Sequence, residues 1–180
     1  MTDVVGTDER ATTPPAAPPR WYPRVVERAA DVALASMPVP LHVLDVGCGA
    51  GELLREMVAR VPYGQSFVGV DPDPATVAAA RRGGDPRMSF VLASPGSLPF
   101  EDASFDLVVA AAGPEGWPDP AAGVAELARV VRDGGRVVLL GRGRGLRRLL
   151  EPAGLRVERR ETVLRRGFTL PYVSAFIAFP

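Results

Sequence analysis

The chain has 180 residues, with 21 basic and 21 acidic side chains, so its formal net charge is zero. A chain of this length can bury a sizeable core as one domain. Its single cysteine, Cys48, excludes an internal disulfide framework, and no apolar run has the length of a membrane span. Because the N-terminus also lacks the basic-then-apolar order of a signal peptide, we expect a cytoplasmic protein.

Hydrophobic periodicity predicts the elements in chain order. Residues 1–19 include TTPPAAPP and are expected to form a disordered tail ahead of a single domain, residues 20–180. Helical spacing of apolar residues predicts an amphipathic helix from Trp21 to Met37. Further helices are predicted near residues 51–60, 74–82, 120–132 and 144–152. Strands are predicted at residues 41–46, 66–70, 87–92, 105–111 and 135–140, with a closing antiparallel hairpin at 155–163 and 171–179. This alternation indicates an α/β fold with a parallel sheet and helices on both faces.

The segment VLDVGCGAGE, Val43 to Glu52, is the most informative part of the chain. An apolar run ends in Asp45, and a helical pattern begins directly after glycines at alternate positions, which are Gly47, Gly49 and Gly51. A strand, a tight turn and a helix N-terminus in this order let a ligand approach the backbone of an open α/β sheet closely. Asp71 closes the next predicted strand, where a carboxylate can accept both hydroxyls of a ribose. We therefore predict a nucleoside site.

The spacing of the turn also selects among nucleosides. A dinucleotide fingerprint reads GxGxxG, but Glu52 stands where its third glycine would be. A carboxylate there would repel a pyrophosphate, and Asp45 is better placed to face an ammonium group than a phosphate. The site is suited to a nucleoside with a cationic end and no phosphate, and S-adenosylmethionine fits that description.

Four ordered segments resemble the class I S-adenosylmethionine-dependent methyltransferases, in particular their small-molecule branch. They are VLDVGCGAGELL, FVGVDPDPATVAAAR, SLPFEDASFDLVVA and WPDPAAGVAELARVVRDGGRVVLL. The resemblance covers roughly residues 41–140. It implies a Rossmann-like, doubly wound sheet of seven mostly parallel strands, with one antiparallel strand near the edge. It also implies S-adenosylmethionine as cofactor and S-adenosylhomocysteine as product.

The resemblance assigns cofactor contacts residue by residue. Asp45 would take the amino end of the methionine moiety, although it could instead cap the loop by accepting backbone N–H groups. Asp71 would bind the ribose, the alternative being an N-cap of the following helix. Further contacts are implied for Gly47, Cys48, Gly49, Gly51, Pro72 and Ala111. Cys48 is interpreted as a small packed residue and not as a catalytic thiol.

The third element departs from the family pattern. The family places an acid after the third strand to bond the adenine amine, followed by a backbone N–H for a ring nitrogen. This chain has Ser94 and Pro95, which offer an uncharged hydroxyl and no N–H. Losing two contacts of about 0.5–1.5 kcal/mol each predicts cofactor binding in the tens of micromolar range or weaker.

Few residues are available to cover the molecule that would accept the methyl group. The family insertion after the fifth strand is nearly absent, so a cap has to come from Trp21 and Tyr22 or from the second subunit of a homodimer. These two aromatic residues could stack over the sulfonium or the acceptor, or anchor the Pro-rich tail. Glu115 is the candidate for an acid–base or positioning role, against a solvated loop acid. The only histidine, His42, starts the first strand and is expected to serve packing.

Charge is distributed unevenly along the chain. Residues 129–166 hold twelve arginines against four acidic residues. This Arg-rich third could dock RNA or an acidic carrier protein, but a solvated helix face and charged edge strands are the preferred interpretation. No Asp/Asn cluster indicates a magnesium site, so no metal is expected.

Two hypotheses of different classes follow. The first is an enzyme that transfers a methyl group from S-adenosylmethionine to a small or carrier-bound metabolite by in-line displacement. The second is a non-catalytic protein of the same fold that acts as a partner subunit or scaffold. An RNA-directed methyltransferase using the Arg-rich third is a variant of the first.

Overall fold

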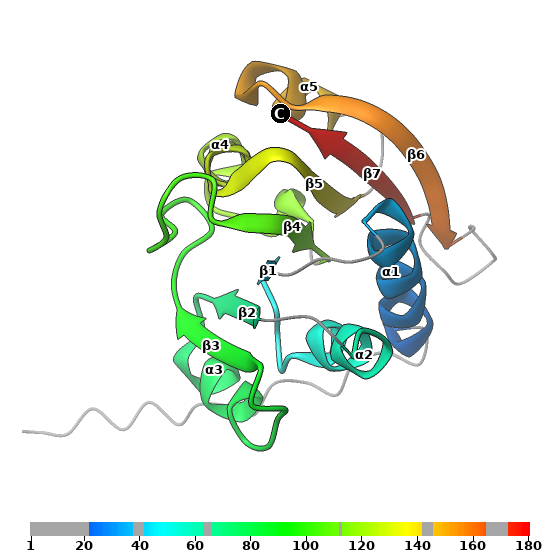
Figure 1. Cartoon of the computed structure of the whole chain (residues 1–180). Coiled ribbons are helices and arrows are strands. Elements are labelled where there is room, and N and C mark those ends of the chain that lie inside the picture. The colour runs from blue at the N-terminus through cyan, green and yellow to red at the C-terminus, as the bar shows by residue number, and fades with distance from the viewer. Residues whose placement is uncertain (1–21, 38–41, 63–65, 112, 142–145, 165–172) are drawn as a thin grey trace, which may run out of the picture.

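The computed structural model describes residues 22–37, 42–62, 66–111, 113–141, 146–164 and 173–180. Within these ranges, seven strands form one sheet in the order β3-β2-β1-β4-β5-β7-β6 (Figure 1). The strands are β1 His42–Val46, β2 Ser66–Asp71, β3 Met88–Leu92, β4 Phe105–Ala110, β5 Val131–Gly141, β6 Arg156–Leu164 and β7 Val173–Phe179. The helices are α1 Tyr22–Ser36, α2 Glu52–Arg60, α3 Pro74–Ala80, α4 Pro120–Val130 and α5 Arg147–Leu150, with short 3₁₀ turns η1 Pro114–Gly116 and η2 Glu151–Ala153. None of the helices in these ranges is long and apolar enough to cross a membrane.

Strands β1 to β5 are parallel, and β7 alone runs antiparallel to both of its neighbours, β5 and β6. The predicted Rossmann-like, doubly wound α/β fold with one antiparallel strand near the edge is therefore confirmed. The expected hairpin at the end of the chain is present, and β7 inserts between β5 and β6. The predicted tail at residues 1–19, and Trp21, lie outside the described residues.

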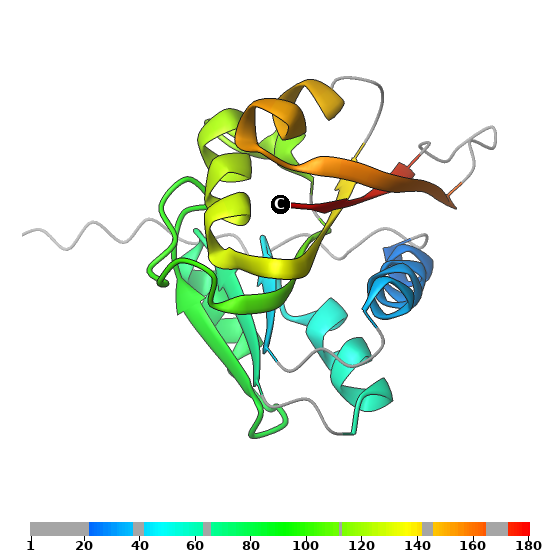
Figure 2. The same ribbon diagram turned by 45° about the horizontal axis from the view of Figure 1, so that its top comes forward.

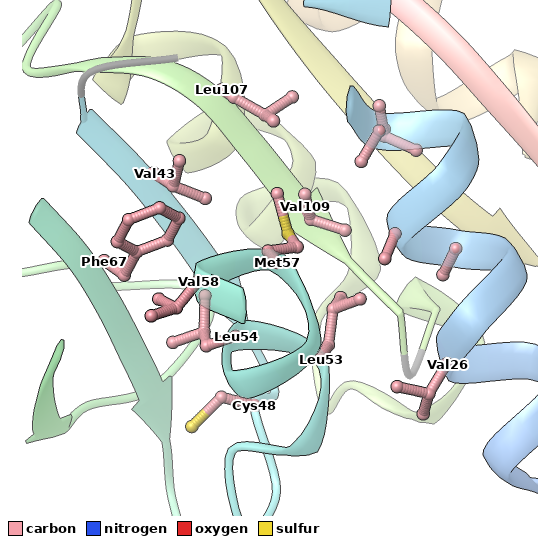
Figure 3. Packing of buried hydrophobic residues seen from close by; sticks show 14 of the residues in the cluster. Val26, Val43, Cys48, Leu53, Leu54, Met57, Val58, Phe67, Leu107 and Val109 are labelled. Carbon is pink, nitrogen blue, oxygen red and sulfur yellow. The ribbon is translucent and has the colours of Figure 1, made fainter. Parts of the chain in front are cut away.

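Two apolar cores lie on the two faces of the sheet because successive strand residues point to opposite sides. Val43, Leu107 and Val138 belong to the core covered by α1, α2 and α3, whereas Leu44 and Val108 belong to the core covered by α4 and α5. Figures 1 and 2 show α1 and α2 on one side of the sheet and α4 on the other. Figure 3 shows the first core, in which side chains of α2 meet those of β1, β2 and β4.

Three predicted helices are shorter than expected, and the one predicted at 74–82 ends at Ala80. The helix predicted at 120–132 ends at Val130, and β5 begins at Val131 instead of residue 135. Val131 is β-branched, which suits a strand, and it pairs with Phe105 of β4. The helix predicted at 144–152 is reduced to α5 followed by η2, because Pro152 has no N–H to continue the helix.

A buried carboxylate joins the amino ends of three strands. Asp106 of β4 accepts the backbone N–H of His42 at 2.7 Å and pairs with Arg132 of β5 at 2.5 Å. His42 Nδ1 lies 3.0 Å from Ser66 Oγ on β2. His42 therefore has a structural position at the end of the sheet opposite the glycine turn.

The segment after β3 is held against α4 by one arginine. Arg129 donates to the backbone oxygens of Phe100 at 2.7 Å and Leu98 at 3.1 Å, and it pairs with Asp102 at 2.8 Å and Glu126 at 2.6 Å. Glu126 in turn accepts the Leu98 N–H at 2.7 Å. This network fixes the segment that leads from β3 to β4.

Replacing Arg129 by Ala should lower the free energy of unfolding by about 2–4 kcal/mol, because two carbonyls and the Glu126 carboxylate lose a shared charged donor. Urea titration would measure the loss. Arg147→Ala is the matched control: its ion pair with Glu151 is exposed and 3.7 Å long, so its loss should cost less than about 0.5 kcal/mol. Equal effects of the two substitutions would contradict a structural role for the network.

Candidate functional site

The glycine turn joins β1 to α2 at the carboxyl end of the sheet. Its three glycines have left-handed backbones, with φ of 76° at Gly47, 56° at Gly49 and 87° at Gly51. The N–H groups of Gly47 and Cys48 donate to the carbonyl of Val70 at 2.8 and 3.0 Å. The turn is therefore held against β2, and its backbone is free of bulky side chains at the glycine positions.

Phe90 of β3 lies directly beneath this turn. A Cβ on Gly51 would lie 2.7 Å from Phe90 Cζ, and a Cβ on Gly69 of β2 would lie 2.7 Å from Phe90 Cδ1 and 2.8 Å from Cys48 Sγ. Phe90 was not among the residues predicted for the site. Gly69, inside the second strand, is a sequence signal for this contact, because a glycine within a strand often marks a place where another group packs closely against the backbone.

Asp45, the fourth residue of β1, is buried, and one of its carboxylate oxygens has no donor among the described residues. Its side chain is 1% exposed, and its Oδ1 has no hydrogen-bond partner among the described residues. Burial, followed by the nearby carboxylates of Glu52 and Asp71, raises the pKa of Asp45 from 3.8 to about 7. Oδ1 thus does not cap the loop, and a cationic donor placed against it would relieve a costly arrangement.

Asp71 links β2 to the glycine turn. Its Oδ2 accepts the Gly49 N–H at 3.1 Å, and its Oδ1 accepts the Asp73 N–H at 3.0 Å. The N-cap of α3 is Asp73, which accepts the N–H groups of Ala75 at 3.1 Å and Thr76 at 3.2 Å. Asp71 is therefore not the cap. Its half-buried carboxylate stands beside the turn, with lone pairs left for further donors, and Pro72 follows it at the surface.

Cys48 contributes its side chain to the core. The thiol is buried, lies 3.5 Å from the Gly49 carbonyl and packs near Leu54 (Figure 3). Burial, together with the carboxylates of Asp45 and Asp71, raises the pKa of the Cys48 thiol far above its usual range. A buried neutral thiol is not a nucleophile, so only the backbone of Cys48 is available to a ligand.

The carboxyl end of β3 lies next to Asp71. Leu92 is paired in register with Asp71, and the Ala93 N–H donates to the Asp71 carbonyl at 3.2 Å. Ser94 is exposed and Pro95 is buried, and the Ser94 carbonyl accepts the Ser97 N–H at 3.1 Å. Sequence reasoning identified Ser94 and Pro95 but missed Leu92, whose side chain is 52% exposed.

Glu115 turns back over the ends of β4 and β5. A Cβ on Gly141, the last residue of β5, would lie 2.7 Å from Glu115 Oε1, and a Cβ on Gly113 would lie 2.5 Å from Oε2. Ala111 is half-buried at the end of β4. Tyr22 is the first residue of α1, and its side chain and the residue Ala112 lie outside the described part.

Three carboxylates, those of Asp45, Glu52 and Asp71, thus surround a turn that is partly exposed at residues 47, 49 and 50. The sequence matches the family model of the methyltransferase domain over residues 44–139, more than half of the chain. This chain belongs to the methyltransferase domain family. Its fold and family are those of the class I S-adenosylmethionine-dependent methyltransferases, as the resemblance predicted.

Similar proteins include several methyltransferases that act on small molecules. The methyltransferase domain is 36% identical over 124 residues to demethylmenaquinone methyltransferase of Thermus thermophilus, covering 67% of this chain and 53% of that protein. It is 36% identical over 103 residues to the chloroplastic tocopherol O-methyltransferase of Arabidopsis thaliana, covering 54% of this chain and 29% of that protein. The chain therefore spans about half the length of the first relative and less of the second.

A solved structure shares the fold. Magnesium protoporphyrin IX methyltransferase from Synechocystis, with S-adenosylmethionine bound, superimposes with a TM-score of 0.68 at 18% identity and covers 88% of this chain and 79% of that one. At this identity the likeness establishes the architecture only.

Proposed function

We propose that this methyltransferase domain binds S-adenosylmethionine at the glycine turn and transfers its methyl group to a small-molecule acceptor by in-line displacement. The observation that carries the proposal is the buried Asp45 Oδ1 without a partner, beside a turn that Asp71 reaches from the next strand. A carboxylate oxygen that is removed from water and has no donor favours a ligand that brings a positive charge.

The residues fit the proposed cofactor. Asp45 would hold the ammonium group, the backbone of residues 47–51 would lie along the methionine and ribose, and Asp71 would accept the ribose hydroxyls. When bound, S-adenosylmethionine supplies a methyl group on a positively charged sulfur. Pro72 and Ala111 flank the same ends of β2 and β4 and would line the site.

The acceptor side rests on Glu115. Its carboxylate lies against Gly113 and Gly141, at the ends of β4 and β5, where an acceptor would meet the methyl group. We propose that Glu115 positions a hydroxyl or a proton-bearing carbon of the acceptor, and that alignment supplies most of the rate. Tyr22 at the start of α1, or a second copy of the chain, would complete the cap.

The relatives indicate the class of acceptor. Their names describe methylation of a menaquinone precursor and of tocopherol, so we propose a small hydroxylated ring compound for this domain. Ion pairs engage three arginines of the Arg-rich third: Arg129 pairs with Glu126, Arg132 with Asp106 and Arg136 with Glu158. This pairing favours a small acceptor over a polyanion.

Substituting Asp71 by Ala should weaken S-adenosylhomocysteine binding by about 10- to 100-fold, because a charge-assisted hydrogen bond to the ribose is lost. Isothermal titration calorimetry measures the change. Asp73→Ala removes a carboxylate two residues away that caps α3, and it should change the dissociation constant less than about threefold. An unchanged affinity in Asp71→Ala would place the ribose elsewhere.

Affinity for the cofactor is expected to be modest. Ser94 carries no charge and Pro95 has no N–H, so a dissociation constant in the tens of micromolar range or weaker is expected. Calorimetry on the unmodified domain tests this directly. A sub-micromolar constant would mean that other groups bind the base strongly.

A thermal-shift titration tests the proposed function itself. Binding to the folded state alone raises the melting temperature, so both S-adenosylmethionine and S-adenosylhomocysteine should stabilise the domain at millimolar concentration. A labelled-methyl assay on hydroxylated aromatic compounds then tests transfer. Absence of stabilisation by either ligand would refute the enzyme and support the non-catalytic partner subunit.

A further inference from the structure

The order of the strands sets the direction in which a nucleoside ligand would extend. Asp45 lies on β1 and Asp71 on β2, and β3 is the next strand in the sheet. A ligand with its amino end at Asp45 and its ribose at Asp71 continues toward the carboxyl end of β3. This inference rests on the proposed function, and it places the base over residues 92–97.

The groups that this segment offers to a base are all uncharged. Residues 92–97 read LASPGS, so none of them carries a charge. Leu92 is 52% exposed and presents an apolar surface beside Asp71. The Ser94 carbonyl already accepts the Ser97 N–H, and Pro95 has no N–H to donate. The side chains left to meet the edge of a base are the exposed serine hydroxyls.

Serine hydroxyls do not discriminate between donors and acceptors, because each one can rotate to donate or to accept. A carboxylate at the same place would accept from a 6-amino group and repel a 6-oxo group. We propose that the flat face of the base packs against Leu92 and that this domain does not distinguish between substituents at position 6 of the purine. Its site then accepts a 6-oxo purine nucleoside about as well as the 6-amino form.

Calorimetric titration with S-adenosylhomocysteine and with S-inosylhomocysteine, which carries an oxo group at position 6 and a hydrogen on N1, tests the inference. The two dissociation constants should agree within about threefold. Ser94→Asp should widen their ratio to at least about tenfold in favour of the 6-amino compound. Ser89→Asp adds the same charge earlier on β3, at an exposed position, and should leave the ratio unchanged.

Leu92→Ser tests the apolar contact separately. It should weaken both compounds by a similar factor, about three- to tenfold, without changing their ratio. Circular dichroism establishes that each variant is folded.

The outcomes separate the inference from the proposed function. If S-adenosylhomocysteine binds the unmodified domain tenfold or more tightly than the 6-oxo compound, the proposed function stands and the inference is wrong. If Ser94→Asp leaves the ratio unchanged, the base does not lie on this segment and the inference also fails. If neither compound binds, the proposed function falls and the inference with it.

Discussion

Replacing Asp45 by Asn should weaken S-adenosylmethionine binding by about 30- to 100-fold at pH 7.5, because the ammonium group loses its ionic partner. The same substitution should make the ligand-free domain more stable above pH 7, since it removes a buried carboxylate whose Oδ1 has no partner. Calorimetry and urea titration measure the two effects. A merely structural role for Asp45 would instead lower stability.

The sign of the pH dependence follows from the direction of the pKa shift. The folded-state pKa of Asp45 is about 7, above its ordinary value of 3.8, so its contribution to stability is lost as the pH rises through this interval. The stability gap between Asp45→Asn and the unmodified domain should widen by about 2–3 kcal/mol from pH 5 to pH 8. An identical gap at both pH values would show that Asp45 titrates normally.

A control for the binding effect is available on the same turn. Glu52 is half-buried at the first position of α2, and Glu52→Gln removes a carboxylate that faces the turn without removing the proposed ammonium partner. Its effect on the dissociation constant should stay below about fivefold. A loss as large as that of Asp45→Asn would mean that the site responds to total negative charge and not to one contact.

The second large effect is expected at Gly51, where substitution by Ala should lower the free energy of unfolding by about 3–5 kcal/mol. The left-handed backbone, with φ of 87°, disfavours any side chain, and a Cβ would lie 2.7 Å from Phe90 Cζ. Gly49→Ala shares the left-handed backbone, but the nearest atom to its Cβ is Glu52 Oε2 at 3.7 Å, so it should cost only about 1–2 kcal/mol.

A second substitution tests whether the added Cβ at residue 51 overlaps with the Phe90 ring. The double variant Gly51→Ala, Phe90→Leu should lose about 1–2 kcal/mol less free energy of unfolding than the sum of the two single losses. The reason is that the two residues share one contact. Urea titration of the four proteins provides the double-mutant cycle. Equal losses at Gly49 and Gly51 would show that the packing of Phe90 under the turn is loose.

Local sequence patterns were sufficient to predict the glycine turn and the sheet. The glycines at alternate positions and the acid at the end of the second strand correctly indicated a turn at residues 47–51 with Asp71 beside it. Alternating strands and helices predicted the sheet. The end of α4 at Val130 was missed because Arg132 and Asp133 suit an exposed helix face equally well, and pairing with β4 decides in favour of a strand.

The rest of the site depends on contacts between distant segments. Phe90 reaches the glycine turn from another strand, and only Gly69 hinted at that approach. The sequence contains Asp45 as an acid after an apolar run, but its lack of a hydrogen-bond partner arises from packing around β1. Asp73 and Asp71 are both suitable helix caps by type, and the structure assigns the cap to Asp73, which directly precedes Pro74 at the first helical position.

A crystal structure of the domain grown with saturating S-adenosylhomocysteine tests the central claim most directly. The proposed site predicts electron density across the glycine turn, with the amino group against Asp45 Oδ1, the ribose hydroxyls on Asp71 and the base over Leu92. Density for the ligand away from residues 47–51, or none despite saturation in solution, would contradict it.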